Sequence, residues 1–378
     1  LESTEGAEEI IDELDSIFFQ FDHIVEKHNI KKVKSLGDTY MCAGGMPNKN
    51  RTNPVEVVLA ALQILTLVDR MRKADPNKIW NISIGIHTGP VNATITGKKK
   101  ISYDLKGDAA NIASRIEAYS GGGRILVSEM TYEFIREYFI CDKVGGLPVK
   151  YTGVVDMYDV VGLKPKFSDD DLLVMPNNRF NVKFGHIRFG DLEEYILNRL
   201  EEELPHYLFY HNVKHTMDVL IGVEVIGTAE GVSEEELLIL KTAGLFHDMG
   251  QIVQSPGHEE ISCDYARKIL PNYLYTQEQI DEVCRVIMAT QLPPEPKDLL
   301  ERIICDADLD YLGRSDFIPV SDSLYDELHY QGIITNKNDW NHLQVKFISN
   351  HQYFTDFANN NREVNKQKQI DRLKSILE

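Results

Sequence analysis

The sequence predicts an α/β domain followed by an all-helical domain, and three observations lead to this fold class. Over 1–163, short strand patterns alternate with amphipathic helical patterns. A stretch rich in proline, asparagine and aspartate follows at 164–185, which is the composition of a linker. From Asp191 onward apolar residues recur at helical spacing and strand patterns fade, so we expect the second domain at 186–378.

The composition argues against some classes of binding partner and favours one cellular compartment. The formal net charge of −19 on 378 residues argues against binding to nucleic acid or to an anionic membrane, because phosphate groups are repelled over most of the surface. The five cysteines are scattered and form no CxxC pair, so they indicate neither a disulfide framework nor a thiolate zinc site. No apolar run reaches the about 20 residues that span a bilayer, and no signal peptide is visible. These features favour a cytoplasmic protein.

The first domain is predicted element by element. A helical pattern already runs at Leu1, from which we expect this chain to be a trimmed portion of a longer one. Strands at Lys32–Met41 are joined at Leu36-Gly37-Asp38, a glycine-assisted turn that exposes a carboxylate. The elements expected next are a helix at Val55–Met71, a strand at Ile79–His87, a helix after Gly107-Asp108, a strand at Arg124–Ser128, a helix at Tyr132–Phe139 and a strand at Met157–Val161.

Polar side chains gather around the helix that follows Gly107. Asn111 and Arg115 are four residues apart and project from one helical face, and Asp104 lies just upstream on an extended segment. The guanidinium suits phosphate oxygens, the amide suits a ribose oxygen, and the carboxylate accepts from an exocyclic amine. Lys98–Lys100 is a local basic patch, either a triphosphate attractor or an ordinary solvated loop. Together these groups predict a nucleotide site.

The helical half carries a second candidate site. His211 and His215 are four residues apart on one helical face, and an adjacent pair, His247-Asp248, follows in an apolar context. Asp306 and Asp308 lie in one short motif further along. Histidine and aspartate on separate helices are what a bundle needs to bind a divalent metal. Any one of these histidines alone is more often an ordinary imidazole, but the ordered set predicts a metal site.

The first half resembles class III adenylate and guanylate cyclases in three ordered motifs, at Lys32–Met41, Ile82–Pro90 and Ile101–Arg115. The resemblance implies a ferredoxin-like α/β domain that forms its active site with a second copy, hence a homodimer. It also implies that ATP is converted to cyclic AMP and pyrophosphate with two Mg²⁺ or Mn²⁺ ions.

The same resemblance implies roles for single residues. Lys34 and Asp104 read the adenine, Asn111 orients the ribose, and Arg115 stabilises the pentavalent phosphorus. Asp38 holds metal together with an aspartate that the family carries on a strand upstream of this chain, although by its motif alone Asp38 could equally be a turn residue. Lys150 lies near the position of a phosphate-binding lysine.

The second half resembles the HD phosphohydrolase superfamily, and its motif Tyr210-His-Asn-Val-Lys-His215 resembles that of cyclic-nucleotide phosphodiesterases. The resemblance implies that His211 protonates the leaving oxygen. It implies that the ligands of a divalent ion, with Zn, Fe and Mn all suited to such a set, are His215, His247, Asp248 and Asp308. Asp306 is an alternative to Asp308. His258 either helps a second metal or only caps the next helix.

Three hypotheses about function follow. The first is an adenylate cyclase fused to a metal-dependent phosphohydrolase, with a cyclic nucleotide as a candidate substrate. The second is a phosphohydrolase whose cyclase-like half senses nucleotide and dimerises without catalysis. The third, two binding scaffolds, is disfavoured by the intact histidine and aspartate set. We expect Phe347–Leu377 to be a packed final helix. The alternative is that this segment contributes residues to the phosphohydrolase pocket.

Overall fold

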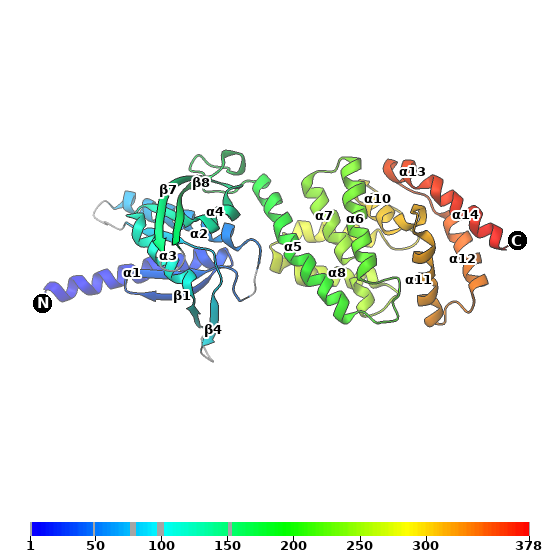
Figure 1. Cartoon of the computed structure of the whole chain (residues 1–378), viewed down its shortest axis with the longest axis horizontal. Helices are drawn as coiled ribbons and strands as arrows, with labels where there is room; N and C mark the ends of the chain where they lie inside the picture. Colours follow the sequence, from blue (N-terminus) through cyan, green and yellow to red (C-terminus); the bar gives the residue numbers. More distant parts are fainter. Residues whose placement is uncertain (1, 48–49, 76–80, 97–101, 150–152, 378) are drawn as a thin grey trace. The chain divides into compact units, whose positions relative to one another are not determined.

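The computed structural model describes residues 2–47, 50–75, 81–96, 102–149 and 153–377 (Figure 1). The chain divides into two compact units, Leu1–Ile187 and Arg188–Glu378. The first unit combines helices with strands, and the second is helical, so the predicted fold class is confirmed. None of the helices in the described ranges combines the length and the apolar character needed to cross a membrane.

The first unit contains both kinds of regular element. Its helices are α1 (Glu2–Lys27), α2 (Asn53–Ala74), α3 (Asp108–Ser120) and α4 (Glu129–Ile135), with a short 3-10 helix η1 (Pro165–Phe167). Its strands are β1 (Lys31–Leu36), β2 (Thr39–Ala43), β3 (Ser83–Ile86), β4 (Asn92–Thr96), β5 (Ser102–Lys106), β6 (Arg124–Ser128), β7 (Phe139–Val149) and β8 (Gly153–Leu163).

A four-stranded sheet in the order β3-β6-β8-β7 forms the centre of this unit. The β3 and β6 strands run parallel, while β8 is antiparallel to both of its neighbours. Two antiparallel hairpins, β1-β2 and β4-β5, complete the strands of the described part. The predicted hairpin turn at Gly37-Asp38 is present between β1 and β2, and Asp104 pairs with Thr94 in the second hairpin.

Side chains of β6 show why helices cover both faces of the sheet. Successive residues of a strand point to opposite faces. Leu126 packs with Ile112 and Ile116 of α3, whereas Ile125 and Val127 pack in a separate cluster with residues of α2. All five are buried. The sheet therefore fixes α3, which carries Asn111 and Arg115, against one face.

The helix predicted at Tyr132–Phe139 differs from the structure. The sequence predicts a helix at Tyr132–Phe139, whereas α4 begins earlier, after Ser128, whose side chain accepts a hydrogen bond from the Thr131 backbone N–H. The chain has re-entered the sheet by Phe139 as β7, which the sequence does not predict. Strand β7 contains Gly145 and Gly146, and its long pairing with β8 overrides its weak local preference for strand.

The segment predicted as a linker is packed in the structure. Phe167, Phe180 and Phe184 lie in the core of the first unit. Helix α5 (Asn178–Glu203) begins within this segment, and its later residues Leu192 and Ile196 belong to the core of the second unit. The division between the units accordingly falls at Ile187, inside this helix.

Within 188–377, where every residue is described, helices are the only regular elements. After α5 they are α6 (Val213–Glu230), α7 (Glu234–Phe246), η2 (Met249–Ile252), α8 (His258–Ile269), η3 (Leu270–Tyr273), α9 (Gln277–Met288), α10 (Leu299–Asp308), η4 (Asp310–Gly313), α11 (Phe317–Tyr330), α12 (Lys337–Asn350), α13 (Asp356–Asn361) and α14 (Glu363–Leu377). The predicted final helix at Phe347–Leu377 is therefore divided into the end of α12, then α13 and α14.

Candidate functional site

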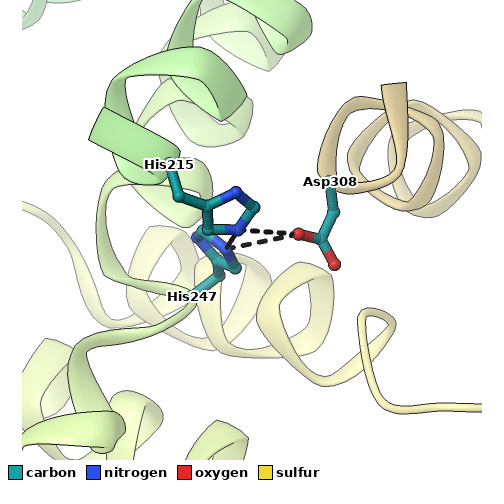
Figure 2. A group of neighbouring side chains, drawn as sticks. All are labelled: His215, His247 and Asp308. Carbon is teal, nitrogen blue, oxygen red and sulfur yellow. Dashed lines mark hydrogen bonds and ion pairs between the residues drawn. The ribbon is translucent and has the colours of Figure 1, made fainter. Parts of the chain in front are cut away.

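Four side chains from three helical segments converge inside the second unit. His215 comes from the first turn of α6, His247 and Asp248 follow α7, and Asp308 ends α10. The two imidazole Nε2 atoms are 3.2 Å apart, and Asp308 Oδ1 lies 3.1 Å from Nε2 of His215 and 3.6 Å from Nε2 of His247 (Figure 2). Asp248 Oδ2 lies 3.4 Å and 3.3 Å from the same two nitrogens. We call these four residues the metal cluster.

Local interactions place each member of the metal cluster. The Asn212 side chain caps α6 by accepting from the backbone N–H of His215, so His215 occupies a fixed first turn. The hydroxyl of Ser262 in α8 donates to the His247 carbonyl at 2.7 Å and accepts from Gly250 N–H at 2.8 Å. A Cβ on Gly250 would lie 2.0 Å from the His258 carbonyl oxygen, so only glycine lets this loop approach α8.

Two hydrogen-bonding details suit the cluster to a metal ion. His247 Nδ1 lies 2.8 Å from the Gly244 carbonyl oxygen, to which it donates, so loss of the other ring proton leaves an Nε2 lone pair directed at the other ligands. Asp248 Oδ2 is buried and has no hydrogen-bond partner among the described residues. A buried carboxylate oxygen without a donor is costly unless a cation satisfies it.

Donor type and spacing also fit a bound ion. The two imidazole nitrogens lie 3.2 Å apart, and each lies 3.1–3.6 Å from one oxygen of Asp248 and one oxygen of Asp308. Four donors held at about 2.0–2.2 Å from one ion in a tetrahedral arrangement are about 3.3–3.6 Å apart. The residues present therefore fit a divalent transition metal, and nitrogen with oxygen donors suits Zn, Fe and Mn.

The charges of the cluster are strongly coupled. Burial alone would lower the pKa of His215 and of His247, but the carboxylates of Asp248 and Asp308 outweigh it and raise both pKa values. Burial would likewise raise the pKa of each carboxyl group, and contacts with the imidazoles instead lower the pKa of Asp248 and of Asp308. The two carboxylates therefore favour positive charge at the two imidazoles, where a divalent cation would take the place of the ring protons.

His211 lies beside the metal cluster and has a partner that the sequence gives no means of finding. Its Nδ1 is 2.5 Å from Glu327 Oε1, and the other oxygen of Glu327 accepts from the backbone N–H groups of Tyr210 at 2.9 Å and His211 at 3.1 Å. The Glu327 side chain is 1% exposed. The His211 ring lies 5.9 Å from that of His215, measured between centroids. Glu327 comes from α11, 116 residues away, and no sequence motif marks it.

The structure distinguishes Asp306 from Asp308 and shows which groups His258 contacts. Asp306 points away from the metal cluster and accepts hydrogen bonds from the backbone N–H groups of Phe354 and Thr355. His258 is adjacent to the cluster, because its Nε2 lies 3.1 Å from Asp248 Oδ1 while its Nδ1 lies 2.8 Å from the Ser255 carbonyl oxygen.

A cavity of about 340 Å³ opens beside the metal cluster, lined in part by His215 and Asp308. Tyr210 and Tyr311 give it aromatic walls. Two basic side chains also line it, and both are ion-paired: Lys214 with Asp218, and Arg314 with Asp218 and Asp316. The cavity can therefore take a ligand with an apolar or aromatic part and a limited negative charge.

The predicted nucleotide residues lie on several elements of the first unit. Lys34 in β1 and Asp38 at the hairpin turn are exposed, as are Asn111 and Arg115 in α3. Arg115 donates to the Pro148 carbonyl in β7 at 3.4 Å. The two hairpins contact each other through β1 and β5, which carry Lys34 and Asp104. Lys150 and the basic patch Lys98–Lys100 lie outside the described residues.

Two family models match the chain. Residues 1–162 match the adenylate and guanylate cyclase catalytic domain, and residues 212–310 match the HD domain. Both resemblances recognised in the sequence are thereby confirmed. The HD match includes the whole metal cluster and ends before Glu327.

Individual relatives match about two fifths of the chain. An adenylate cyclase of Mycobacterium tuberculosis is 31% identical over 151 residues, which are 40% of this chain and 34% of that protein. Human guanylyl cyclase C is 35% identical over 162 residues, or 41% of this chain and 15% of the relative. The guanylate cyclase domain of RhGC from Catenaria anguillulae, solved with GTP, is 30% identical and covers 40% of this chain and 82% of its own, with a TM-score of 0.35. The chain thus spans about a third or less of these curated relatives.

Proposed function

Because the chain joins a class III cyclase catalytic domain to an HD domain, we propose that it makes a cyclic nucleotide and hydrolyses a phosphate ester. The first reaction would convert ATP to cyclic AMP and pyrophosphate. The second would hydrolyse a phosphodiester, with a cyclic nucleotide as the candidate that best suits the His211 motif. The curated relatives include both adenylate and guanylyl cyclases, so the choice of ATP comes from the residues of this chain.

The residue types at two positions favour ATP. A lysine at position 34 donates to a ring nitrogen of adenine, and an aspartate at position 104 accepts from its exocyclic amine. Contact between β1 and β5 supports a shared role, because it brings the hairpins that carry these residues together. A guanine has a carbonyl oxygen where adenine has the amine, and Asp104 would repel it.

The exposure of the nucleotide residues supports a homodimer. Lys34, Asp38, Asn111 and Arg115 all lie at the surface of the first unit. A site that closes only when two copies meet needs such exposed side chains. Asp38 of one copy would serve ATP held by the other residues of its partner, and Lys150 would contact the phosphates.

The cyclisation would be an attack by the ribose 3′ oxygen on the α-phosphorus, with pyrophosphate as the leaving group. Asn111 would hold the ribose in line for this attack, and Arg115 would stabilise the charge that develops on the phosphorus oxygens. Mg²⁺ or Mn²⁺ at Asp38 would supply neutralisation of the phosphate charge.

In the HD domain the four residues of the metal cluster would hold a divalent ion, which supplies an activated water and polarises the phosphate. His211 would carry a proton on Nε2 and deliver it to the leaving oxygen. Glu327 would hold that ring in one orientation through its contact with Nδ1. The aromatic walls of the cavity, Tyr210 and Tyr311, would contact the organic part of the substrate.

One observation carries the hydrolase proposal: two imidazole nitrogens 3.2 Å apart each lie 3.1–3.6 Å from an oxygen of Asp248 and an oxygen of Asp308, and the Asp248 oxygen has no hydrogen-bond partner among the described residues. The test is to incubate the chain with ATP or GTP, and separately with cyclic AMP or cyclic GMP, in Mg²⁺ and Mn²⁺, and to separate the products by chromatography. His247→Ala should abolish hydrolysis and spare cyclisation, while Arg115→Ala should do the reverse, so each variant controls for the other.

The second candidate is a phosphohydrolase whose cyclase-like half binds nucleotide without turning it over. The intact metal cluster of the second unit, together with the exposed nucleotide residues of the first, favours it over two inert scaffolds. Under this hypothesis no cyclic nucleotide forms from ATP or GTP, and Asn111→Ala changes only the response of hydrolysis to added nucleotide. Cyclic AMP formed by the wild-type chain and lost in Asn111→Ala would exclude it.

A further inference from the structure

Asp308 is flanked by two buried aspartates that serve a different purpose. Asp306 is 0% exposed and accepts hydrogen bonds from the backbone N–H groups of Phe354 at 3.0 Å and Thr355 at 2.8 Å. The Thr355 hydroxyl donates to the same carboxylate at 2.7 Å. A carboxylate that receives this many donors is held in one orientation.

The second flanking residue, Asp310, is 7% exposed and binds the guanidinium of Arg362. Arg362 Nε lies 2.7 Å from Oδ1, and Nη2 lies 3.3 Å from Oδ2, a two-point contact that fixes direction as well as distance. A Cβ on Gly313, at the end of η4, would lie 2.5 Å from the Arg362 Cβ. The backbone after Asp308 therefore packs directly against the residue that binds Asp310.

The segment that supplies these contacts is itself anchored. Thr355 caps α13 by accepting from Ala358 N–H at 3.2 Å. The backbone N–H of Phe357 donates to Glu230 at 2.7 Å, and Glu230 is the last residue of α6. Residues 354–362, which we call the C-terminal clamp, thus join the end of α10 to the helix that carries His215.

We propose that the C-terminal clamp is a positioning element for the metal ligand Asp308. The reason is geometric: α10 ends at Asp308 and the chain changes direction into η4, so the ligand stands in the last turn of the helix, where the carbonyl groups have no partner within the helix. The clamp binds Asp306 and Asp310, which lie two residues before and two residues after Asp308. It lies outside the matched HD domain, which ends at residue 310. The inference rests on the proposed metal-dependent function.

Threonine 355 allows a sharp test in the full chain. Thr355→Val keeps the shape of the side chain but removes the hydroxyl that donates to Asp306 and caps α13, whereas Thr355→Ser keeps both bonds. Thr276→Val is the matched control, because Thr276 caps α9 in the same unit and accepts from Gln279 N–H at 3.3 Å. Cobalt(II) is titrated into metal-free protein and followed by visible absorption. The absorption of a chain carrying His215→Ala and His247→Ala is subtracted, which removes the signal from cobalt(II) bound elsewhere.

The clamp predicts that Thr355→Val binds cobalt(II) about tenfold more weakly than wild type, the usual effect of removing support from a ligand. Thr355→Ser and Thr276→Val should bind like wild type. A purely structural role would lower the unfolding temperature of Thr355→Val equally with and without metal and leave the dissociation constant unchanged, and this result overturns the proposal.

A second pair of variants keeps the test decisive if Thr355→Val does not fold. Arg362→Lys retains the charge but loses the two-point contact with Asp310, and Arg199→Lys makes the same change in the Arg199–Glu203 pair of α5. Cobalt(II) affinity should fall in Arg362→Lys alone, and equal affinity in the two variants contradicts the clamp. Failure of wild type to bind cobalt(II) at the cluster would instead refute the metal-dependent hydrolase, so the two ideas fail separately.

Discussion

Glu327 has two tasks at the residue scale: it orients His211 and it satisfies two backbone N–H groups. One oxygen contacts the ring at Nδ1, and the other accepts from the backbone of Tyr210 and His211. Burial alone would raise the pKa of Glu327, but the hydrogen bonds and charge of His211 outweigh it and lower the pKa. The side chain is therefore an ionised carboxylate in the folded protein.

Replacing this carboxylate should weaken proton delivery to the leaving group. We expect Glu327→Gln to slow hydrolysis of a cyclic nucleotide by at least about tenfold, because an alkoxide leaving group needs a proton. The same variant should hydrolyse bis(p-nitrophenyl) phosphate at nearly the wild-type rate, since nitrophenolate leaves without one. Both rates are measured as kcat at saturating metal. Equal slowing with both substrates would mean that Glu327 supports the fold or the metal rather than the acid.

The lowered pKa of Glu327 also predicts how stability depends on pH. Its folded-state pKa lies below the unfolded value of about 4.3, so its ionised form stabilises the folded protein above that pH. This contribution should disappear as the pH falls through the lower, folded-state pKa. The difference in free energy of unfolding between wild type and Glu327→Gln, from urea titrations, should therefore be constant from pH 7 to about 5 and shrink below about pH 4. A difference that grows with acidity would contradict this assignment.

At the scale of elements, the metal cluster depends on close contact between η2 and α8. This contact occurs where Gly250 meets the carbonyl oxygen of His258 and where Ser262 bridges to His247 and to Gly250. The loop after His247-Asp248 cannot keep its position if this contact opens.

Gly250→Ala should therefore destabilise the second unit, because its new Cβ would lie 2.0 Å from a backbone oxygen that cannot turn aside. We expect a loss of about 1–3 kcal/mol in the free energy of unfolding and weaker metal binding. Gly244→Ala is the matched control: its Cβ meets no atom closer than 3.4 Å, and alanine favours the helix. Chemical denaturation measures the free energy of unfolding of both variants. An unchanged free energy of unfolding in Gly250→Ala would show that the contact can relax.

At the scale of the whole molecule, the two units should respond differently to loss of metal. Each has its own core, and the metal cluster belongs entirely to the second. An ion that binds only the folded cluster at about 100 times its dissociation constant would stabilise that unit by about 2.7 kcal/mol.

Removal of metal by a chelator should accordingly raise hydrogen exchange in α6, α7 and α10 while leaving β6 and α2 unchanged. Exchange measured by mass spectrometry on the full chain, before and after addition of EDTA, reports both units at once. A chain carrying His215→Ala should show no further change on chelation. Protection lost equally in β6 would mean that the metal stabilises something other than this cluster.

The fold class was predictable because it depends on periodicities that are local in sequence. Alternating strand and helix patterns, followed by helical patterns alone, indicated both units, and the hairpin turn at Gly37-Asp38 was visible as a pattern of residue types. Strand β7 was not predictable, because its glycines have a weak preference for strand and its pairing with β8 provides the stability instead. The packing of Phe167 and Phe180 was hidden in a segment whose composition resembled a linker.

The same distinction between local and long-range information applies to the candidate metal site. Sequence alone determined which residues could bind a metal, since the paired histidines, the His247-Asp248 pair and the late aspartates are rare together and each lies within a short motif. Only the tertiary structure decided that Asp308 joins the cluster while Asp306 binds residues 354 and 355, and that Glu327 orients His211. These outcomes depend on contacts between segments tens to more than a hundred residues apart, for which local spacing holds no information.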